Sequence, residues 1–250
     1  MDAIATARIA LACLDLTSLN DADTEADIDQ LCAKAQGPHG PVAAVCVWPR
    51  LAAHARAQLP AHIRVAAVAN FPDGSRDLRR AVRDTEDIVH AGAQEVDVVF
   101  PYRDFAHAPA LLNAVRRACE GLTLKVILET GELVDEARIA QACRIALDNG
   151  ADFLKTSTGK TPKSASPEAA RALLGAIANR AEARGRVGFK PSGGIRTVAD
   201  AAVYIELTRR ALGDAALVPQ RFRFGASGLL NDIQAVLGGT ARPEAAKTGY

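Results

Sequence analysis

Residues 151–190 have the sequence ADFLKTSTGKTPKSASPEAARALLGAIANRAEARGRVGFK, in which two short apolar runs flank an alanine-rich segment. The runs at 151–158 and 187–190 have the length and composition of buried strands. The segment between them, 167–185, has helical apolar spacing and ends at a glycine, which is typical of a helix C-terminus. A strand, a helix and a second strand in this order predict a parallel β-α-β unit.

The same alternation continues along the rest of the chain. Six further apolar runs of the β type occur at 9–16, 42–48, 65–71, 95–102, 122–129 and 222–226, and further helical segments at 75–92, 133–150 and 197–213. Eight strands alternating with helices in 250 residues predict a (β/α)8 TIM barrel of the α/β class. An open, doubly wound sheet is the alternative. Without a linker rich in Pro, Gly or Ser, we expect one domain over 1–250, with a flexible tail at about 240–250.

Composition and charge favour a cytoplasmic protein that acts on a small polar ligand. Lys and Arg number 30 against 29 Asp and Glu, and no long run of one sign occurs, which disfavours nucleic-acid and membrane partners. The five cysteines are odd in number and widely spaced, as expected of reduced thiols. The N-terminus lacks a basic segment before an apolar stretch, and no apolar run reaches the roughly 20 residues of a membrane span.

Polar side chains interrupt the predicted strands toward their C-terminal ends. Those ends form the catalytic face of a barrel, and a charged group in an apolar run needs a partner or a function. For two of these residues, Asn70 and Glu129, a bond to loop backbone is the simpler interpretation. The full set of candidates is Asp15, Cys46, Asn70, Asp97, Lys125, Glu129, Lys155 and Lys190.

Lys155 and Lys190 lie at the ends of two adjacent predicted strands. A nucleophilic amine must lose its proton near neutral pH, so its pKa must fall from about 10.4 to about 7. Burial, or a second ammonium about 4 Å away that repels by roughly 4 kcal/mol at an effective dielectric near 20, would cause that fall. Lys155 is therefore a candidate nucleophile and Lys190 its perturber. The alternative is that both lysines only pair with Asp97 or another carboxylate.

Other polar residues in the strands have two interpretations each. Asp97, between valines, fits a proton shuttle or a structural ion pair with a lysine. Asp15 is comparable, because it would hold a substrate hydroxyl or anchor a lysine. Cys46 is interpreted as a small buried hydrophobe, although a thiol facing the site would contact substrate and react with unsaturated aldehydes. The five histidines lack metal-ligand spacing, so we expect no metal.

Two glycine-rich turns predict a phosphate site. Gly193 and Gly194 follow the seventh predicted strand, the segment 225–228 follows the eighth, and each turn precedes a helix. Glycines let backbone N–H groups approach an anion, and these two loops are the usual phosphate site of such barrels. The segment 158–160 would add a hydroxyl and a cation. Tight turns without a ligand are the alternative.

Seven stretches spread over nearly the whole chain resemble the deoxyribose-phosphate aldolase family. In order they are LDLTSLN (14–20), VCVWPR (45–50), ANFP (69–72), EVDVVFPY (95–102), LKVILETGE (124–132), FLKTSTGK (153–160) and GFKPSGGIR (188–196). The resemblance implies a class I aldolase that reversibly cleaves 2-deoxy-D-ribose 5-phosphate to D-glyceraldehyde 3-phosphate and acetaldehyde through a lysine Schiff base. It also implies a place in deoxynucleoside catabolism and no cofactor.

The resemblance further implies roles for individual residues. Lys155 would form the Schiff base, Lys190 would perturb it and relay protons, and Asp97 would be a general acid/base acting through water. Residues matching positions around the sugar phosphate are Thr158, Gly159, Lys160, Gly193, Gly194, Gly225 and Ser227. Residues matching positions that line the rest of the site are Asp15, Thr17, Leu19 and Lys125.

Two positions near the C-terminus bear on this resemblance. Similar bacterial proteins often carry a second serine after the one matching Ser227, whereas this chain has Gly228. One side-chain contribution to phosphate binding is therefore missing, although backbone N–H donation survives the change. The last residue, Tyr250, resembles a mobile terminal tyrosine that assists proton transfer in relatives, and an idle tail is the alternative.

Two other functions are compatible with the same residues. An isomerase or epimerase would use Asp97 as the base and Lys155 as an electrostatic stabiliser. A phosphometabolite-binding protein would hold the sugar phosphate without turnover. Borohydride trapping of an imine separates the first from an aldolase, and acetaldehyde release separates the second. Because helical outer faces of barrels often pair, a homodimer is the expected assembly.

Overall fold

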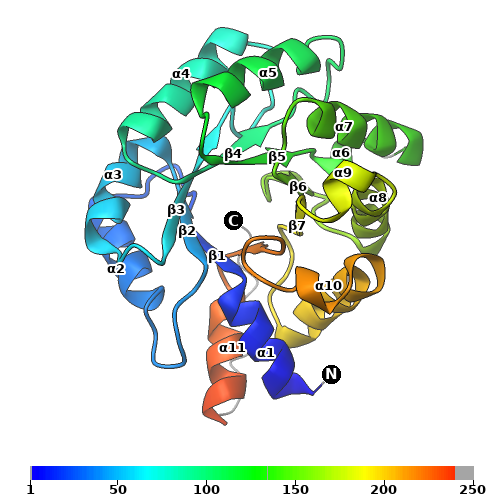
Figure 1. Cartoon of the computed structure of the whole chain (residues 1–250). Helices are drawn as coiled ribbons and strands as arrows, with labels where there is room; N and C mark the ends of the chain where they lie inside the picture. Colours follow the sequence, from blue (N-terminus) through cyan, green and yellow to red (C-terminus); the bar gives the residue numbers. More distant parts are fainter. Residues whose placement is uncertain (1, 134, 240–250) are drawn as a thin grey trace.

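Eight parallel strands form the centre of the molecule (Figure 1). The structure is a computed structural model that describes residues 2–133 and 135–239. Bridges between Phe189 and Phe222 and between Ser192 and Gly225 join β7 to the β8 side, so the ring is nearly closed. The predicted (β/α)8 barrel is confirmed, and the open sheet is wrong. The strands are β1 Leu14–Thr17, β2 Ala44–Val47, β3 Arg64–Ala69, β4 Glu95–Val99, β5 Thr123–Ile127, β6 Phe153–Lys155, β7 Gly188–Lys190 and β8 Phe224–Ala226.

Helices surround the strands, and their buried faces form the apolar core with the outer side of the barrel (Figure 1). In the part of the chain that the structure describes, no helix is long and apolar enough to cross a membrane. All five cysteines are buried and unpaired. The helices are α1 Ala3–Ala12, α2 Glu25–Lys34, α3 Pro49–Gln58, α4 Leu78–His90, α5 Ala108–Ala118, α6 Thr130–Leu133, α7 Glu136–Asp148, α8 Pro167–Ala178, α9 Ala181–Arg184, α10 Val198–Leu212, the 3-10 turn η1 Asp214–Ala216 and α11 Leu229–Gly238.

Two sequence-based boundaries are wrong. The predicted strand 9–16 begins as helix, because α1 is N-capped by Asp2, whose carboxylate accepts from the Ala5 N–H at 2.7 Å. The apolar residues of α1 pack against α10 and α11 on the outside of the barrel, so only the end of the run enters the sheet. The predicted helix 167–185 is broken into α8 and α9, because Arg180 between them adopts an extended backbone.

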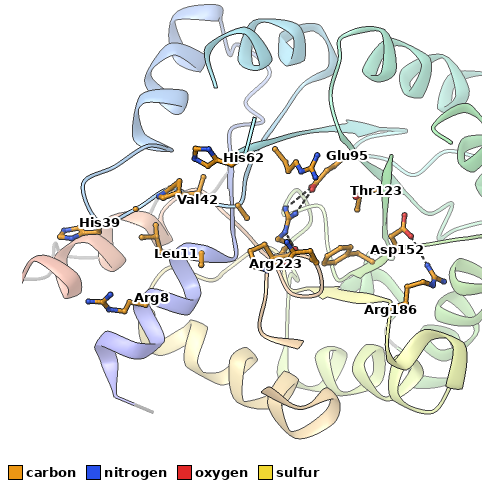
Figure 2. Close-up of a pocket in the computed structure, with 18 residues that line it drawn as sticks. Arg8, Leu11, His39, Val42, His62, Glu95, Thr123, Asp152, Arg186 and Arg223 are labelled. Atoms are coloured by element: carbon orange, nitrogen blue, oxygen red, sulfur yellow. Dashed lines mark hydrogen bonds and ion pairs between the residues drawn. The ribbon is translucent and has the colours of Figure 1, made fainter. Parts of the chain in front are cut away.

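The two ends of the barrel differ in what they expose. The C-terminal ends of β6 and β7 carry Lys155 and Lys190 and lead into the glycine-containing loops. A cavity of about 660 Å³ opens at the opposite end, where residues such as Arg64 and Asp152 begin or precede strands (Figure 2). The buried Arg223, just before β8, lies at the inner side of this cavity. The barrel interior between the two ends is filled with charged side chains.

Candidate active site

An ion-paired group of side chains, here called the interior cluster, fills the barrel. All of its members are buried, and they come from five strands and from the residue preceding β8. Strand alternation explains part of this arrangement, since residues two apart, such as Glu95 and Asp97, point to the same face. The interior cluster consists of Asp15, Glu95, Asp97, Lys125, Lys155, Lys190 and Arg223.

Asp97 is the central acceptor of the interior cluster. Its Oδ2 atom lies 2.8 Å from both Lys155 Nζ and Lys190 Nζ, and its Oδ1 atom lies 2.6 Å from Lys125 Nζ. Burial raises the pKa of Asp97, but the charges of Lys125, Lys155 and Lys190 outweigh it and hold the pKa well below its usual range. Asp97 is therefore a carboxylate at neutral pH.

Lys155 has a single carboxylate partner among the described residues, Asp97. Burial lowers the pKa of Lys155, the Asp97 charge opposes this, and the neighbouring Lys190 ammonium lowers the pKa further, so that the net change is downward. The arrangement thus favours the neutral amine. Burial is the larger cause, whereas the sequence pointed equally to a second cation.

Lys190 has the opposite tendency although it is equally buried. Its Nζ atom lies 2.5 Å from Asp15 Oδ2 and 2.8 Å from Asp97 Oδ2. Burial lowers the pKa of Lys190, but the two carboxylates outweigh it and raise the pKa above its usual value. Pairing of both Lys155 and Lys190 with Asp97, the alternative left open by the sequence, is present in the structure. Only Lys190 has the second carboxylate that keeps it charged.

Lys125, Glu95 and Arg223 form the part of the interior cluster that lies toward the N-terminal ends of the strands. Lys125 contacts Glu95 and Asp97 at 2.6 Å each and Asp15 at 3.6 Å. Burial lowers the pKa of Lys125, and Asp97 and Glu95 outweigh it and raise the pKa. Arg223 contacts Asp15 at 2.5 Å and Glu95 at 2.7 Å. Sequence reasoning missed Glu95 and Arg223, although the two-residue spacing of Glu95 from Asp97 pointed to a shared face.

Three further predicted residues lie near these groups on β1, β2 and the loop after β1. Cys46 is buried on β2, and burial, followed by the Asp97 charge, raises its pKa, so its thiol stays protonated. Thr17 is paired in register with Cys46 and donates to the Asp15 carbonyl at 2.8 Å. The Leu19 carbonyl accepts from Lys160 Nζ at 2.7 Å, which joins the first and sixth strand-to-helix loops.

Glu129 organises the loop after β6. Its Oε2 atom accepts from Thr158 Oγ1 at 2.5 Å and from the Thr158 N–H at 3.2 Å, and Thr158 Oγ1 accepts from the Lys160 N–H at 3.0 Å. Glu129 has a left-handed backbone with φ of 54°. Asn70 shares this φ, and its amide donates to the Ser75 and Val99 carbonyls. Bonding of both side chains to loop backbone is confirmed.

Two of the predicted phosphate glycines, Gly193 and Gly225, occupy places where a side chain does not fit. A Cβ atom on Gly193, whose φ is 84°, would lie 2.5 Å from Ser164 Oγ and 3.3 Å from Gly159 Cα. A Cβ atom on Gly225 would lie 2.5 Å from Ser192 Oγ. Gly225 lies within β8 rather than after it. The loops after β6 and β7 and the end of β8 therefore meet with their backbones in close contact.

The helices that follow β7 and β8 have different N-termini. The first turn of α10 is closed by a capping box between Thr197 and Asp200. The N-cap of α11 is Gly228, which offers no side-chain cap, and it follows Ser227 at the surface. The α11 terminus is therefore the one that leaves N–H groups for an anion, with the favourable end of the helix dipole.

Tyr250 and the predicted tail at 240–250 lie outside the described residues. Within residues 2–133 and 135–239, no group of three or more His, Cys, Asp or Glu side chains is arranged to hold a metal ion. Lysines and carboxylates of the interior cluster and backbone of the surrounding loops thus make up the candidate active site. Such an arrangement can form an imine, move protons and bind an anion.

Comparison with known proteins gives a consistent family. The family model described as DeoC/LacD family aldolase matches residues 9–235. A deoxyribose-phosphate aldolase of Agrobacterium fabrum is 45% identical over an alignment of 252 positions, which covers 98% of this chain and 96% of that protein.

Solved structures show the same fold. A structure from Toxoplasma gondii assigned to deoxyribose-phosphate aldolase has a TM-score of 0.85 at 24% identity and covers 95% of this chain and 96% of its own. The tetrameric deoxyribose phosphate aldolase of Aeropyrum pernix has a TM-score of 0.73 at 23% identity, covering 94% and 96%. The chain therefore belongs to the DeoC/LacD family of aldolases, and within it to the deoxyribose-phosphate aldolases, which are carbon–carbon lyases.

Proposed function

We propose that this chain reversibly cleaves 2-deoxy-D-ribose 5-phosphate to D-glyceraldehyde 3-phosphate and acetaldehyde through an imine on Lys155. The observation that carries the proposal is the unequal pairing of two buried lysines. Lys155 has one carboxylate partner among the described residues and a lowered pKa, while Lys190 has two and a raised pKa. A neutral amine beside a fixed ammonium is what nucleophilic attack on a carbonyl requires.

The reaction begins at the C1 aldehyde of the open-chain sugar. The neutral Lys155 amine adds to C1, and the carbinolamine hydroxyl takes up a proton and leaves as water, which gives a protonated imine. Asp97, 2.8 Å from Lys155 Nζ, supplies the negative charge that stabilises this cation. Lys190 donates to the same Asp97 oxygen and lies within reach to pass protons between Asp97 and the reacting oxygen.

Carbon–carbon cleavage follows from the imine. The C3 hydroxyl loses its proton to Asp97 or water, the C2–C3 bonding electrons move toward the imine nitrogen, and D-glyceraldehyde 3-phosphate leaves as the aldehyde. Protonation of the remaining enamine at C2 and addition of water release acetaldehyde and restore the Lys155 amine. These steps need no electron acceptor besides the imine, so no cofactor enters the proposal.

Asp97 acts in this scheme as a relay rather than as a proton store. Its pKa lies well below the usual range, so a proton that it accepts passes on to water or to an amine. The same property disfavours an isomerase that would use Asp97 as a lone base, because a strong base would need a raised pKa. The unequal Lys155 and Lys190 pairing also has no use in a binding protein without turnover.

The phosphate group would bind where the loops after β6, β7 and β8 meet. Backbone N–H groups at Gly194 and at the uncapped start of α11 after Gly228 would face it, with the Ser227 hydroxyl beside them. Lys160 would provide a cation after release from the Leu19 carbonyl, or would hold the two loops together. Close contact of the glycines, rather than a single motif, supports this placement.

The decisive experiment is reduction of the imine in place. The native chain is incubated with acetaldehyde and sodium borohydride, and intact mass and peptide mapping locate the product. We expect one N-ethyl group on Lys155, none in Lys155→Met, and an unchanged adduct in Lys163→Met, which removes an exposed lysine of the same loop. A folded native chain without an adduct would overturn the proposal.

Substrate identity needs a second measurement. Acetaldehyde release is compared for 2-deoxy-D-ribose 5-phosphate and unphosphorylated 2-deoxy-D-ribose, and the phosphate ester should have the higher kcat/KM.

The reaction would serve deoxynucleoside catabolism in the cytoplasm, which the resemblance and the free thiols support. A homodimer remains our prediction, and the tetramer of the Aeropyrum pernix relative makes solution scattering the appropriate test.

A further inference from the structure

Glu95 and Arg223 occupy the end of the barrel opposite the loops that would hold the sugar phosphate. Both line the cavity at the N-terminal ends of the strands, and Figure 2 shows them pointing toward one another, joined by hydrogen bonds. They are only 2% and 4% exposed. Neither residue has a part in the reaction proposed above, yet each adds a full charge to the interior cluster.

Two chains of direct contacts lead from this pair to Lys155. Glu95 contacts Lys125 at 2.6 Å, and Lys125 contacts Asp97 at 2.6 Å. On the other side, Arg223 contacts Asp15 at 2.5 Å, Asp15 contacts Lys190 at 2.5 Å, and Lys190 contacts Asp97 at 2.8 Å. Both chains end at Asp97, whose carboxylate lies 2.8 Å from Lys155 Nζ.

The charges of the interior cluster nearly balance. With every group ionised, it contains three carboxylates and four cations among the described residues, so loss of one proton makes it neutral. Lys155 is the member with fewest carboxylate contacts. A buried cluster is stabilised by neutrality, because each uncompensated charge carries a desolvation cost.

We propose that Glu95 and Arg223 are positioning residues that, through Lys125 and Asp15, set the charge balance of the interior cluster and thereby select Lys155 as the group that loses a proton. The inference rests on the proposed function, because it assigns a purpose to the neutral Lys155 amine. Glu95 favours the ammonium form of Lys155 and Arg223 disfavours it. Removing the Glu95 charge should therefore lower the pKa of Lys155, and removing the Arg223 charge should raise it.

Other ionisable groups face Lys155 and stay in place in this test. They are Asp97 on β4, Lys190 on β7, the Cys46 thiol on β2 and Glu129 after β5. The Cys46 thiol is neutral, and Glu129 bonds to Thr158 rather than to the interior cluster. The sign of each shift therefore depends on the charge removed at the opposite end of the barrel.

The experiment measures the pH dependence of imine trapping at Lys155 with acetaldehyde and cyanoborohydride, together with kcat/KM. The acid limb of this pH profile is the range in which trapping falls as Lys155 becomes protonated. Glu95→Gln removes a negative charge, so the acid limb should move to lower pH. Arg223→Gln removes a positive charge, so the limb should move to higher pH. Each shift should be on the order of one pH unit, as for a unit charge a few ångströms beyond its neighbour at an effective dielectric near 20.

Exposed residues provide matched controls. Glu182→Gln and Arg186→Gln remove the same charges outside the interior cluster, and neither should move the limb. A merely structural role for Glu95 and Arg223 would lower stability or kcat without shifts of opposite sign. Unshifted profiles, or shifts of the same sign, in folded variants would overturn the inference.

Folding and the proposed function are tested separately. Circular dichroism and urea unfolding establish that each variant is folded. If Arg223→Gln does not fold, the double variant Glu95→Gln with Arg223→Gln removes both charges, and its limb should return toward that of the native chain from the Glu95→Gln position. No trapping on the native chain at any pH would contradict the imine itself, whereas native trapping with an unmoved limb in Glu95→Gln would contradict only the inference.

Discussion

Lys125 and Lys155 lie on neighbouring strands, are both buried, and donate to the same carboxylate of Asp97, yet their pKa values move in opposite directions. Burial lowers the pKa of each. Lys125 also contacts Glu95 at 2.6 Å and Asp15 at 3.6 Å, and Asp97 together with these two carboxylates more than offsets burial. Lys155 has Asp97 alone among the described residues, and burial prevails.

The comparison shows that the number of carboxylate contacts, rather than depth in the barrel, separates a lysine with a raised pKa from one with a lowered pKa here. Both side chains are almost completely excluded from water. A lysine with two or three carboxylates has a raised pKa and stays a cation, whereas the lysine with one shared carboxylate has a lowered pKa. Removal of the shared carboxylate, removal of either lysine, and acid unfolding test this difference, beginning with the largest expected effect.

Asp97→Asn removes the carboxylate that both lysines share. The amide leaves Lys125, Lys155 and Lys190 without their common counter-charge, and the relay between the reacting groups is lost. We expect kcat/KM to fall by about 10²- to 10⁴-fold, with a loss of about 3–5 kcal/mol in the free energy of unfolding. Steady-state kinetics and urea unfolding measure the two. A variant with native kinetics would show that Asp97 only neutralises charge elsewhere.

Lys125→Met and Lys155→Met compare the two lysines directly. Without Lys125, Glu95 and Asp97 lose an ammonium that they contact at 2.6 Å each, so unfolding free energy should fall by about 3–5 kcal/mol. Without Lys155, Asp97 keeps two ammoniums and the protein loses a group whose charged form is disfavoured by burial. The expected change is about 1 kcal/mol or less. Equal losses in urea unfolding at neutral pH would contradict the distinction.

Acid should unfold the protein through the carboxylates of the interior cluster. Asp15, Glu95 and Asp97 all have lowered pKa values in the folded state because of their cationic partners, which outweigh burial. Their contribution to stability is complete above their unfolded pKa values of about 4 and is lost as pH falls toward the folded values. Thermal unfolding should therefore change little from pH 7 to about pH 5 and decline below about pH 4. The Asp97→Asn variant should show a shallower decline.

Gly228→Ser tests the departure from similar bacterial proteins and has the smallest expected effect. Gly228 has an ordinary helical backbone, φ of −83° and ψ of −18°, and no atom lies within 4 Å of a Cβ added there. A serine hydroxyl at this position should lower KM for the phosphorylated sugar by about three- to tenfold, as one added hydrogen bond does. Gly228→Ala should leave KM unchanged, as should either variant with unphosphorylated deoxyribose. An equal effect of alanine would assign the change to α11 itself.

The barrel and the position of Lys155 and Lys190 at the ends of its strands were predictable because their signals are local. Charged residues at the ends of apolar runs, such as Lys155 and Lys190, stand out in any β-α alternation, and parallel strand ends gather at one face. The strand predicted at 9–16 was wrong at its start, because a short apolar run does not distinguish helix from strand. The Asp2 side chain caps α1 and so favours helix over strand at the start of this run, and such a cap is a detail of local geometry.

The distinct roles of the lysines were not predictable, because they depend on pairs far apart in the chain. Arg223 and Glu95 are separated by 128 residues and meet only when β8 closes beside β1. A sequence shows which residues are charged but not how many carboxylates each ammonium contacts. That number is fixed by strand register, such as the pairing of Asp97 with Lys125 on β5.

Strand length divides the barrel in a way that bears on its motions. The strands β6, β7 and β8, which carry or border Lys155, Lys190 and Gly225, have three residues each, whereas β3 has six and β4 and β5 have five. Fewer ladder hydrogen bonds hold the side of the ring that carries Lys155 and Lys190, and the free energy of local opening is lower where such bonds are few. Backbone amides of β6 to β8 should therefore exchange with deuterium sooner than those of β3 to β5. Local opening then begins at the strands that carry Lys155 and Lys190, while β3 to β5 stay paired.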